Sequence, residues 1–100
     1  MDGADPTQLC EAFAARGYGL HSLKQYAEAR TAFADCMDVD GGLSLQRGSA
    51  RFHIGLGFYE EEDYAEAQQH FDMFLKMEGV FPEERKRATK YLSDLKKNLS

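Results

Sequence analysis

The sequence predicts an all-α fold of two helical hairpins followed by a fifth, capping helix. The first observation is a repeat: the stretch KQYAEARTAF at residues 24–33 returns 38 residues later as EDYAEAQQHF at residues 62–71. The second is periodicity, because apolar residues in both copies recur at the spacing of one helix face. Together they indicate one helix–turn–helix unit that is built twice.

The first hairpin is expected over residues 5–41. Asp5 and Pro6 mark its start, because aspartate caps helix N-termini and proline suits the first helical position. This helix should end near Lys24. A second helix should begin at about Tyr26 and stop at a pair of glycines, which commonly end helices.

The second hairpin is expected over residues 49–79, after a linker of residues 41–48. Its first helix should run from about Ser49 to Glu61. An acidic turn follows, and a second helix should run from there to a stop at Gly79. The plan matches that of the first hairpin, so the two units should share one geometry.

The capping helix is expected over residues 82–98, and the whole chain, residues 1–100, is read as a single domain. Pro82 opens this helix, with acidic residues in its first turn and lysines in its last, and both placements suit the helix dipole. Its apolar stripe would cover the second hairpin. The stripe consists of Ala88, Tyr91, Leu92, Leu95 and Leu99.

Glycines inside the predicted helices need a packing reason, because each costs about 1 kcal/mol relative to alanine in an exposed helix. We expect them to let the second helix of each hairpin cross close to the first, opposite Ala29 and Ala67. The four glycines are Gly17, Gly19, Gly55 and Gly57.

Charge limits the classes of partner. Residues 1–79 carry a net charge of −8 and residues 80–100 a net charge of +3. A mostly acidic body repels phosphate backbones, so nucleic-acid binding is not expected. The apolar runs are too short for a membrane span, and no secretory signal pattern is visible, so a cytoplasmic location is expected.

No catalytic or metal-binding motif is visible, and no cofactor is expected. Cys10 and Cys36 lack the paired spacing of zinc ligands and are expected to be reduced, mostly buried thiols, with a disulfide as the less favoured reading. The chain's histidines lie in no HExxH pattern, and no Ser-His-Asp or Cys-His set can be assembled. An enzyme or a metal-binding protein is therefore the least favoured class.

The repeat resembles the tetratricopeptide repeat (TPR), a helix–turn–helix unit. The first copy follows its pattern at Phe13, Gly17, Leu20, Tyr26, Ala29, Phe33 and Cys36, and the second at Gly55, Phe58, Tyr64, Ala67 and Phe71. Four features depart from the pattern: the spacing of 38 residues is longer than usual, Gly41 and Gly79 stand where proline is common, Arg51 stands where a large apolar residue is usual, and Phe74 stands where a small residue is usual. The resemblance implies a superhelical stack.

The resemblance also implies a concave face lined by the first helix of each hairpin. A peptide or a partner helix would bind there, with exposed aromatic side chains as anchors. The expected site residues are Tyr18, His21, Phe52, His53, Leu56 and Tyr59. The alternative is that Tyr18, Phe52 and Leu56 pack beneath the fifth helix or against a neighbouring molecule.

We therefore expect a non-catalytic protein–protein interaction module, an adaptor, scaffold or chaperone. Two narrower functions stay open. Residues 51–71 are similar to the repeats of class II-like chaperones of bacterial type III secretion, and two-repeat mitochondrial fission adaptors share the repeat number. Because two repeats bury little core, help from self-association or from a longer parent protein is also expected.

Overall fold

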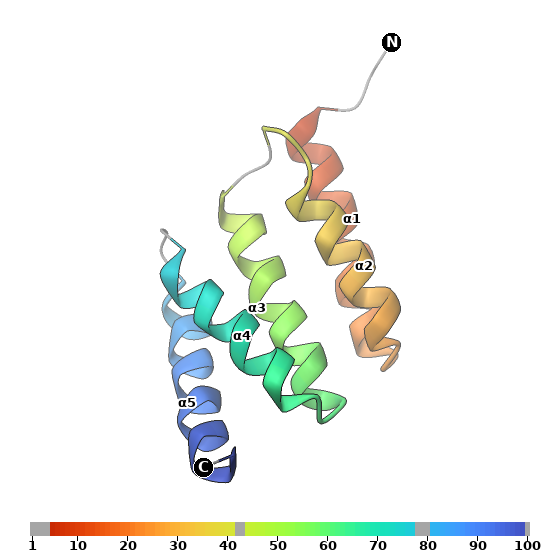
Figure 1. Ribbon diagram of the computed structural model, residues 1–100. Helices are drawn as coiled ribbons and strands as arrows, with labels where there is room; N and C mark the ends of the chain where they lie inside the picture. Colours follow the sequence, from red (N-terminus) through yellow and green to blue (C-terminus); the bar gives the residue numbers. More distant parts are fainter. Residues whose placement is uncertain (1–4, 42–43, 78–80, 100) are drawn as a thin grey trace.

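The structure, a computed structural model, describes residues 5–41, 44–77 and 81–99, and every regular element in these ranges is an α-helix. The prediction of an all-α fold is confirmed. Neighbours in sequence are neighbours in space, so that two antiparallel hairpins and a last helix lie side by side (Figure 1). The helices are α1 (Pro6–Ser22), α2 (Tyr26–Met37), α3 (Ser44–Glu60), α4 (Tyr64–Lys76) and α5 (Pro82–Leu99).

The first helix begins as predicted. The Asp5 side chain accepts a hydrogen bond from the Thr7 backbone N–H at 2.9 Å, and Pro6 occupies the first turn. The cap satisfies one of the N–H groups that a helix start leaves without a partner. Helix α1 ends at Ser22, slightly before the predicted end, because Lys24 adopts the left-handed conformation with φ of 64°.

The turns within the two hairpins are the same to the level of main-chain hydrogen bonds. Lys24 and Glu62, 38 residues apart, are both left-handed, with φ of 64° and 65°. In each turn this residue donates to the carbonyl three positions back, and the next residue donates to the carbonyl five positions back. The four bonds join Lys24 to His21, Gln25 to Leu20, Glu62 to Tyr59 and Asp63 to Phe58. The sequence repeat is therefore a structural repeat.

Two of the four helical glycines pack closely against the second helix of their hairpin, as predicted, but the side chain they face is a phenylalanine and not the expected Ala29 or Ala67. A Cβ atom added at Gly17 would lie 2.6 Å from the Phe33 ring, and one added at Gly55 would lie 3.0 Å from the Phe71 ring. The two phenylalanines are themselves equivalent in the repeat, so each hairpin closes on the same contact. At Gly19 the packing explanation is wrong, because no atom lies within 4 Å of an added Cβ.

The predicted linker of residues 41–48 is in large part helical. Helix α3 begins at Ser44, five residues before the predicted start at Ser49. Gly48, which suggested a linker, is a packing glycine inside α3, since a Cβ there would lie 2.2 Å from Cζ of Phe81. Gly57 makes only ordinary contact, with Arg30 Nη1 3.5 Å from an added Cβ.

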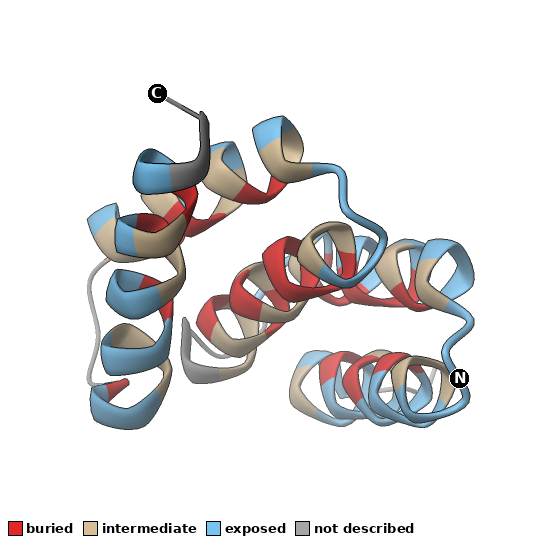
Figure 2. Cartoon of the chain, turned by 90° about the horizontal axis from the view of Figure 1, so that it is seen from below, coloured by how far each residue is buried: buried red, intermediate tan, exposed pale blue. Residues whose placement is uncertain are grey.

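Helix α3 contributes to two separate hydrophobic clusters. Ala50 and Ile54 complete the first core, whereas Phe52 and Leu56, two residues further along, belong to the second. The buried residues accordingly lie between helices (Figure 2). The first core also contains Cys10, Ala14, Ala29, Phe33, Cys36 and Val39, and the second also contains Ala67, Phe71, Phe74, Phe81, Ala88, Leu92 and Leu95.

Helix α5 covers the second hairpin. Its stripe is buried at Ala88, Leu92 and Leu95, as predicted, and half-buried at Tyr91; the side chain of Leu99 lies outside the described residues. The guanidinium of Arg85 donates to the carbonyls of Leu75 at 2.9 Å and Met77 at 3.3 Å, which joins the start of α5 to the end of α4. The predicted stop at Gly79 also lies outside the described residues.

The two cysteines meet in the first core. Cys10 and Cys36 are fully buried free thiols whose sulfur atoms lie 2.6 Å apart, one on α1 and the other on α2. Burial, together with the neighbouring Cys10 thiol, raises the pKa of Cys36 to about 12. The Cys36 thiol is therefore protonated at neutral pH.

Candidate functional site

Two open hollows lie on opposite sides of α3. We call the first the inner groove: it lies between α1, α3 and the start of α5 and has a volume of about 390 Å³. It is lined by Glu11, Ala14, Ala15, Tyr18, Gln46, Ser49, Phe81 and Glu84. The second, which we call the outer groove, lies between α2, α3 and α4 and has a volume of about 610 Å³.

Tyr18 is the predicted site residue that lines the inner groove. Its side chain is 39% exposed. The hydroxyl shares a hydrogen bond of 2.5 Å with the Ser49 hydroxyl across the two hairpins. One edge of the ring packs against Phe33 and His53, with centroids 5.3 and 4.9 Å away. The ring is thus fixed on one side and open to solvent on the other, as an anchor for a partner would be.

His21 and His53 lie at the junction of the hairpins, beside the inner groove. Their ring centroids are 5.9 Å apart. The Nδ1 atom of His53 lies 2.8 Å from the Ser49 carbonyl, which fixes the proton on that nitrogen. Nδ1 of His21 is buried and has no hydrogen-bond partner. Burial is the main cause that lowers the pKa of both rings.

Phe52 and Leu56 are not groove residues, and the expectation that their side chains are exposed is wrong. They are 0% and 6% exposed and lie in the second core. Phe52 packs on Phe71 and Phe74 at centroid distances of 5.7 and 5.5 Å, and the Arg87 guanidinium lies 5.0 Å above its ring. The alternative prediction, that these two side chains pack beneath the fifth helix, agrees with their position in one cluster with Ala88, Leu92 and Leu95 of α5.

Tyr59 lies away from the inner groove, where α3, α4 and α5 meet. Its half-buried ring contacts Tyr91 at 4.6 Å and Tyr64 at 5.6 Å between centroids. Burial raises the pKa of its hydroxyl, and the nearby Tyr64 hydroxyl and Asp94 raise it further. These contacts hold α5 against the second hairpin. Of the six expected site residues, the structure therefore brings Tyr18, His21 and His53 together beside the groove. Phe52 contacts the His53 ring, at 5.1 Å between centroids, but does so from within the second core, whereas Leu56 and Tyr59 do not line the groove.

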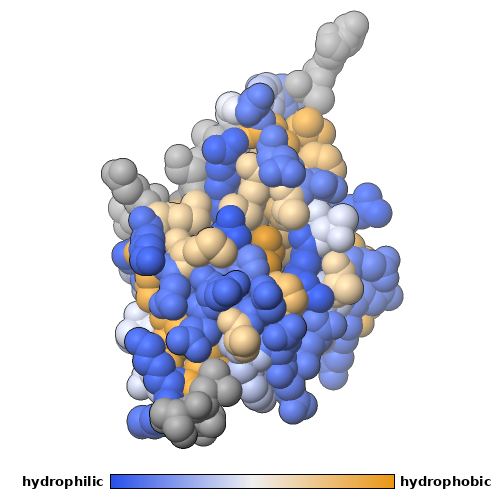
Figure 3. Space-filling view, in the orientation of Figure 1, coloured by the Kyte–Doolittle hydropathy of each residue, from blue (hydrophilic) through white to orange (hydrophobic). Residues whose placement is uncertain are grey.

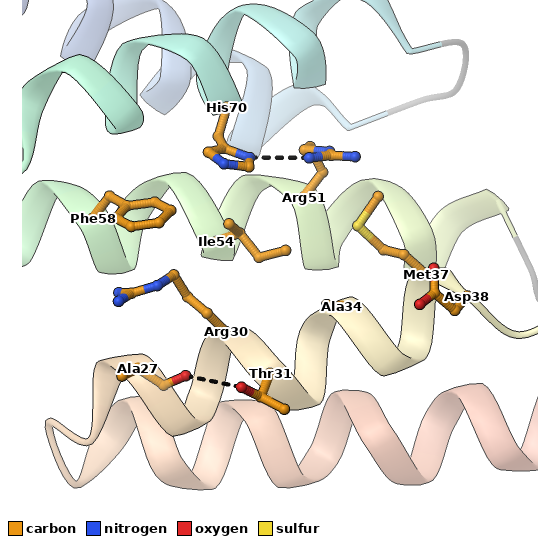
Figure 4. A pocket seen from close by; sticks show the side chains of 10 residues that line it. All are labelled: Ala27, Arg30, Thr31, Ala34, Met37, Asp38, Arg51, Ile54, Phe58 and His70. Atoms are coloured by element: carbon orange, nitrogen blue, oxygen red, sulfur yellow. Dashed lines mark hydrogen bonds between the residues drawn. The ribbon is translucent and has the colours of Figure 1, made fainter.

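The outer groove has an apolar floor and a polar rim (Figure 4). On the face seen in Figure 3, hydrophobic side chains are visible in a hollow that hydrophilic side chains surround. The lining consists of Ala27, Arg30, Thr31, Ala34, Met37, Asp38, Arg51, Ile54, Phe58 and His70. Sequence reasoning did not single out this groove, although Arg51 was a visible signal, because it stands where the repeat expects an apolar residue.

Two arginines line this groove, and they differ in the partner that their guanidinium groups contact. Arg30 forms an ion pair with Glu61, and its guanidinium lies 4.0 Å above the Phe58 ring. Arg51 donates from Nη1 to Nδ1 of His70 at 3.0 Å. A nitrogen that accepts is unprotonated, so His70 is neutral here; burial, followed by the charge of Arg51, lowers its pKa.

No group of side chains suited to hold a metal ion is found among residues 5–41, 44–77 and 81–99. In these ranges no three His, Cys, Asp or Glu side chains are close enough together to hold a metal ion. None of the helices described there combines the length and apolar character needed to cross a bilayer. The geometry offers grooves with mixed polar and apolar walls, which suit the binding of another chain.

Comparisons with known proteins add no assignment: no family model matches the chain, and neither a curated protein nor a solved structure is found to be similar to it.

Proposed function

We propose that the chain is a TPR-like superhelical module that binds a segment of another protein in its inner groove, without catalysis. The observation that carries the proposal is Tyr18, a partly exposed aromatic ring fixed by Ser49 and His53 at the wall of an open groove. The identical turns and the matched Gly17 and Gly55 contacts support the TPR-like architecture.

Charge indicates what the partner segment should carry. Glu11 and Glu84 line the inner groove from α1 and α5, and among the residues that the structure describes no basic side chain forms an ion pair with either of them. The body around the groove is acidic as well, with a net charge of −8 over residues 1–79. A segment with an apolar side chain beside a lysine or an arginine is therefore favoured over an acidic one.

Affinity capture with the full chain tests the inner groove. Ala15 is exposed on α1 and lines the groove, so Ala15→Arg fills it without touching the core. Ala65→Arg, on an exposed site of α4 outside both grooves, is the matched control. We expect the wild type and Ala65→Arg to retain the same proteins and Ala15→Arg to lose them. Retention of the same set by Ala15→Arg would contradict the proposal.

The identity of the captured proteins also separates the narrower functions. Secreted translocator proteins would support a type III secretion chaperone, and organelle-division factors would support a fission-type adaptor. Either function would be carried out in the cytoplasm, which is the location that we propose for the chain. Light scattering on the purified chain tests whether it associates with itself, which is the proposed source of stability for so short an array.

A further inference from the structure

We propose that the outer groove is a second binding site, which takes an apolar segment of a partner protein that carries one carboxylate, with Arg51 as its anchor. This groove lies across α3 from the inner groove and shares no lining residue with it. The proposal therefore goes beyond the function proposed above and stands independently of it.

The first argument is the state of Arg51. Arg51 is half-buried, and the hydrogen bond of its guanidinium goes to the neutral ring of His70. Within the described part of the chain, no carboxylate lies at ion-pair distance from it. Removing a guanidinium from water without a counter-charge is unfavourable, and a bound carboxylate offsets that cost through short, charge-assisted hydrogen bonds.

The second argument comes from the repeat. At the offset of 38 residues, Arg51 is equivalent to Phe13, and His70 is equivalent to Ala32. In the first hairpin these positions are apolar: Phe13 packs on the first core, and Ala32 is 2% exposed. The hairpin itself therefore does not require a polar pair there. The second hairpin carries one, and both of its members line the outer groove.

The third argument concerns the orientation of the arginine. His70 accepts from one Nη1–H of Arg51, and in Figure 4 the two side chains meet at one wall of the groove. His70 is in turn near Glu66, with Nε2 and the carboxylate oxygen 3.7 Å apart. The hydrogen bond to His70 limits the motion of the Arg51 guanidinium. It uses one N–H group and leaves the others for a ligand, since an arginine carries five donors.

The remaining lining residues define the rest of the ligand. Arg30 is already neutralised by Glu61, so it adds little attraction for an anion. Ile54, Phe58 and Met37 supply apolar surface along the floor. Asp38 lines the groove as well and would repel a second acid. The site therefore fits a single carboxylate flanked by apolar side chains, and it does not fit an acidic run.

The test is an NMR titration of the full chain with three blocked pentapeptides that differ only in the middle residue: Leu-Leu-Glu-Leu-Leu and its Gln and Lys versions. We expect the glutamate peptide to shift the Nε–H signal of Arg51 and amide signals of α2, α3 and α4. The glutamine peptide should bind on the order of tenfold more weakly, a loss of about 1.4 kcal/mol, because a hydrogen bond to a charged partner is stronger than one to a neutral amide. The lysine peptide should bind more weakly still.

Matched variants complete the test. Arg51→Gln should abolish the preference for glutamate over glutamine, whereas Arg16→Gln, which removes an exposed arginine on α1, should leave it intact. Arg51→Lys keeps the charge and shows whether the forked guanidinium matters. Equal affinity for the glutamate and glutamine peptides, an unchanged preference in Arg51→Gln, or absence of shifts at millimolar peptide would overturn the proposal. Ala15→Arg, which blocks the inner groove, should have no effect here.

Discussion

At the scale of single residues, helical glycines that look alike in sequence have different roles. Gly17 faces the Phe33 ring at a distance that leaves no room for a side chain, while Gly19, two positions later, faces open space. The pattern in sequence identified both as unusual but could not tell them apart, because which glycine meets the neighbouring helix depends on how the hairpin is rotated.

Exchange of these two glycines for alanine should therefore have opposite effects. Gly17→Ala places a Cβ 2.6 Å from Phe33 and should destabilise the fold, by about 1–3 kcal/mol as is typical of overpacking. Gly19→Ala should stabilise it by about 0.5–1 kcal/mol, since alanine forms helix better and meets no neighbour. Urea unfolding of both variants measures the difference. A gain of stability in Gly17→Ala would contradict this prediction and would show that α1 and α2 can move apart at the Phe33 contact at little cost.

At the scale of elements, the helices were predictable from sequence and their packing only in part. The start of α1, the hairpin turns and the start of α5 follow from local signals: a cap, a repeat and a proline. The start of α3 does not, because Gly48 is explained only by the Phe81 ring, which comes from another element. Phe52 and Leu56 were misplaced for a similar reason: periodicity gives a helix face but not the neighbour that covers it.

The α1–α2 pair should accept a cross-link between Cys10 and Cys36. Their sulfur atoms are 2.6 Å apart, and the two residues are 26 positions apart in the sequence. With diamide as the oxidant, both thiols lose a proton and an electron, the disulfide forms and the diazene becomes a hydrazine. We expect stabilisation of about 3 kcal/mol and slow reaction in the native state, because burial raises the pKa of Cys36 to about 12.

Intact mass and non-reducing electrophoresis check this cross-link. The expected product is a monomer lighter by two hydrogen atoms, whose unfolding midpoint in urea rises and returns on reduction. Cys36→Ser serves as the control and should show no such shift. Oxidation to covalent dimers instead of monomers would mean that the two thiols are more accessible to other molecules than to each other.

At the scale of the whole molecule, stability should depend on three histidines. His21, His53 and His70 all have a pKa lowered below 6.5 by burial, so each is neutral when folded and gains a proton more readily when unfolded. The stability they contribute is fully present above pH 6.5 and is lost as the pH falls from there toward the folded-state values. The free energy of unfolding should therefore fall over this range, by at most about 1.4 kcal/mol per pH unit for each histidine.

Urea unfolding on either side of pH 6.5 measures this dependence. Around His53 the charged or titratable neighbours are His21 and Arg87, which oppose its protonation, and Glu84, which favours it. His53→Asn keeps an N–H donor for the Ser49 carbonyl and should give a shallower dependence on pH. An identical slope in His53→Asn would assign the acid sensitivity to other groups.

The position of α3 between two cores has a consequence for how the chain can be divided. Although the sequence reads as two copies, the border between the copies in sequence is not a border in folding. If the chain were cut after residue 41, the first hairpin would lose Ala50 and Ile54 of α3 from its core. Phe33 and its neighbours in that core would then be exposed to water. The smallest fragment that keeps this core covered extends through Glu60, where α3 ends, and it would in turn leave Phe52 bare. A chain that repeats itself in sequence would therefore not separate into two halves that each keep a covered core.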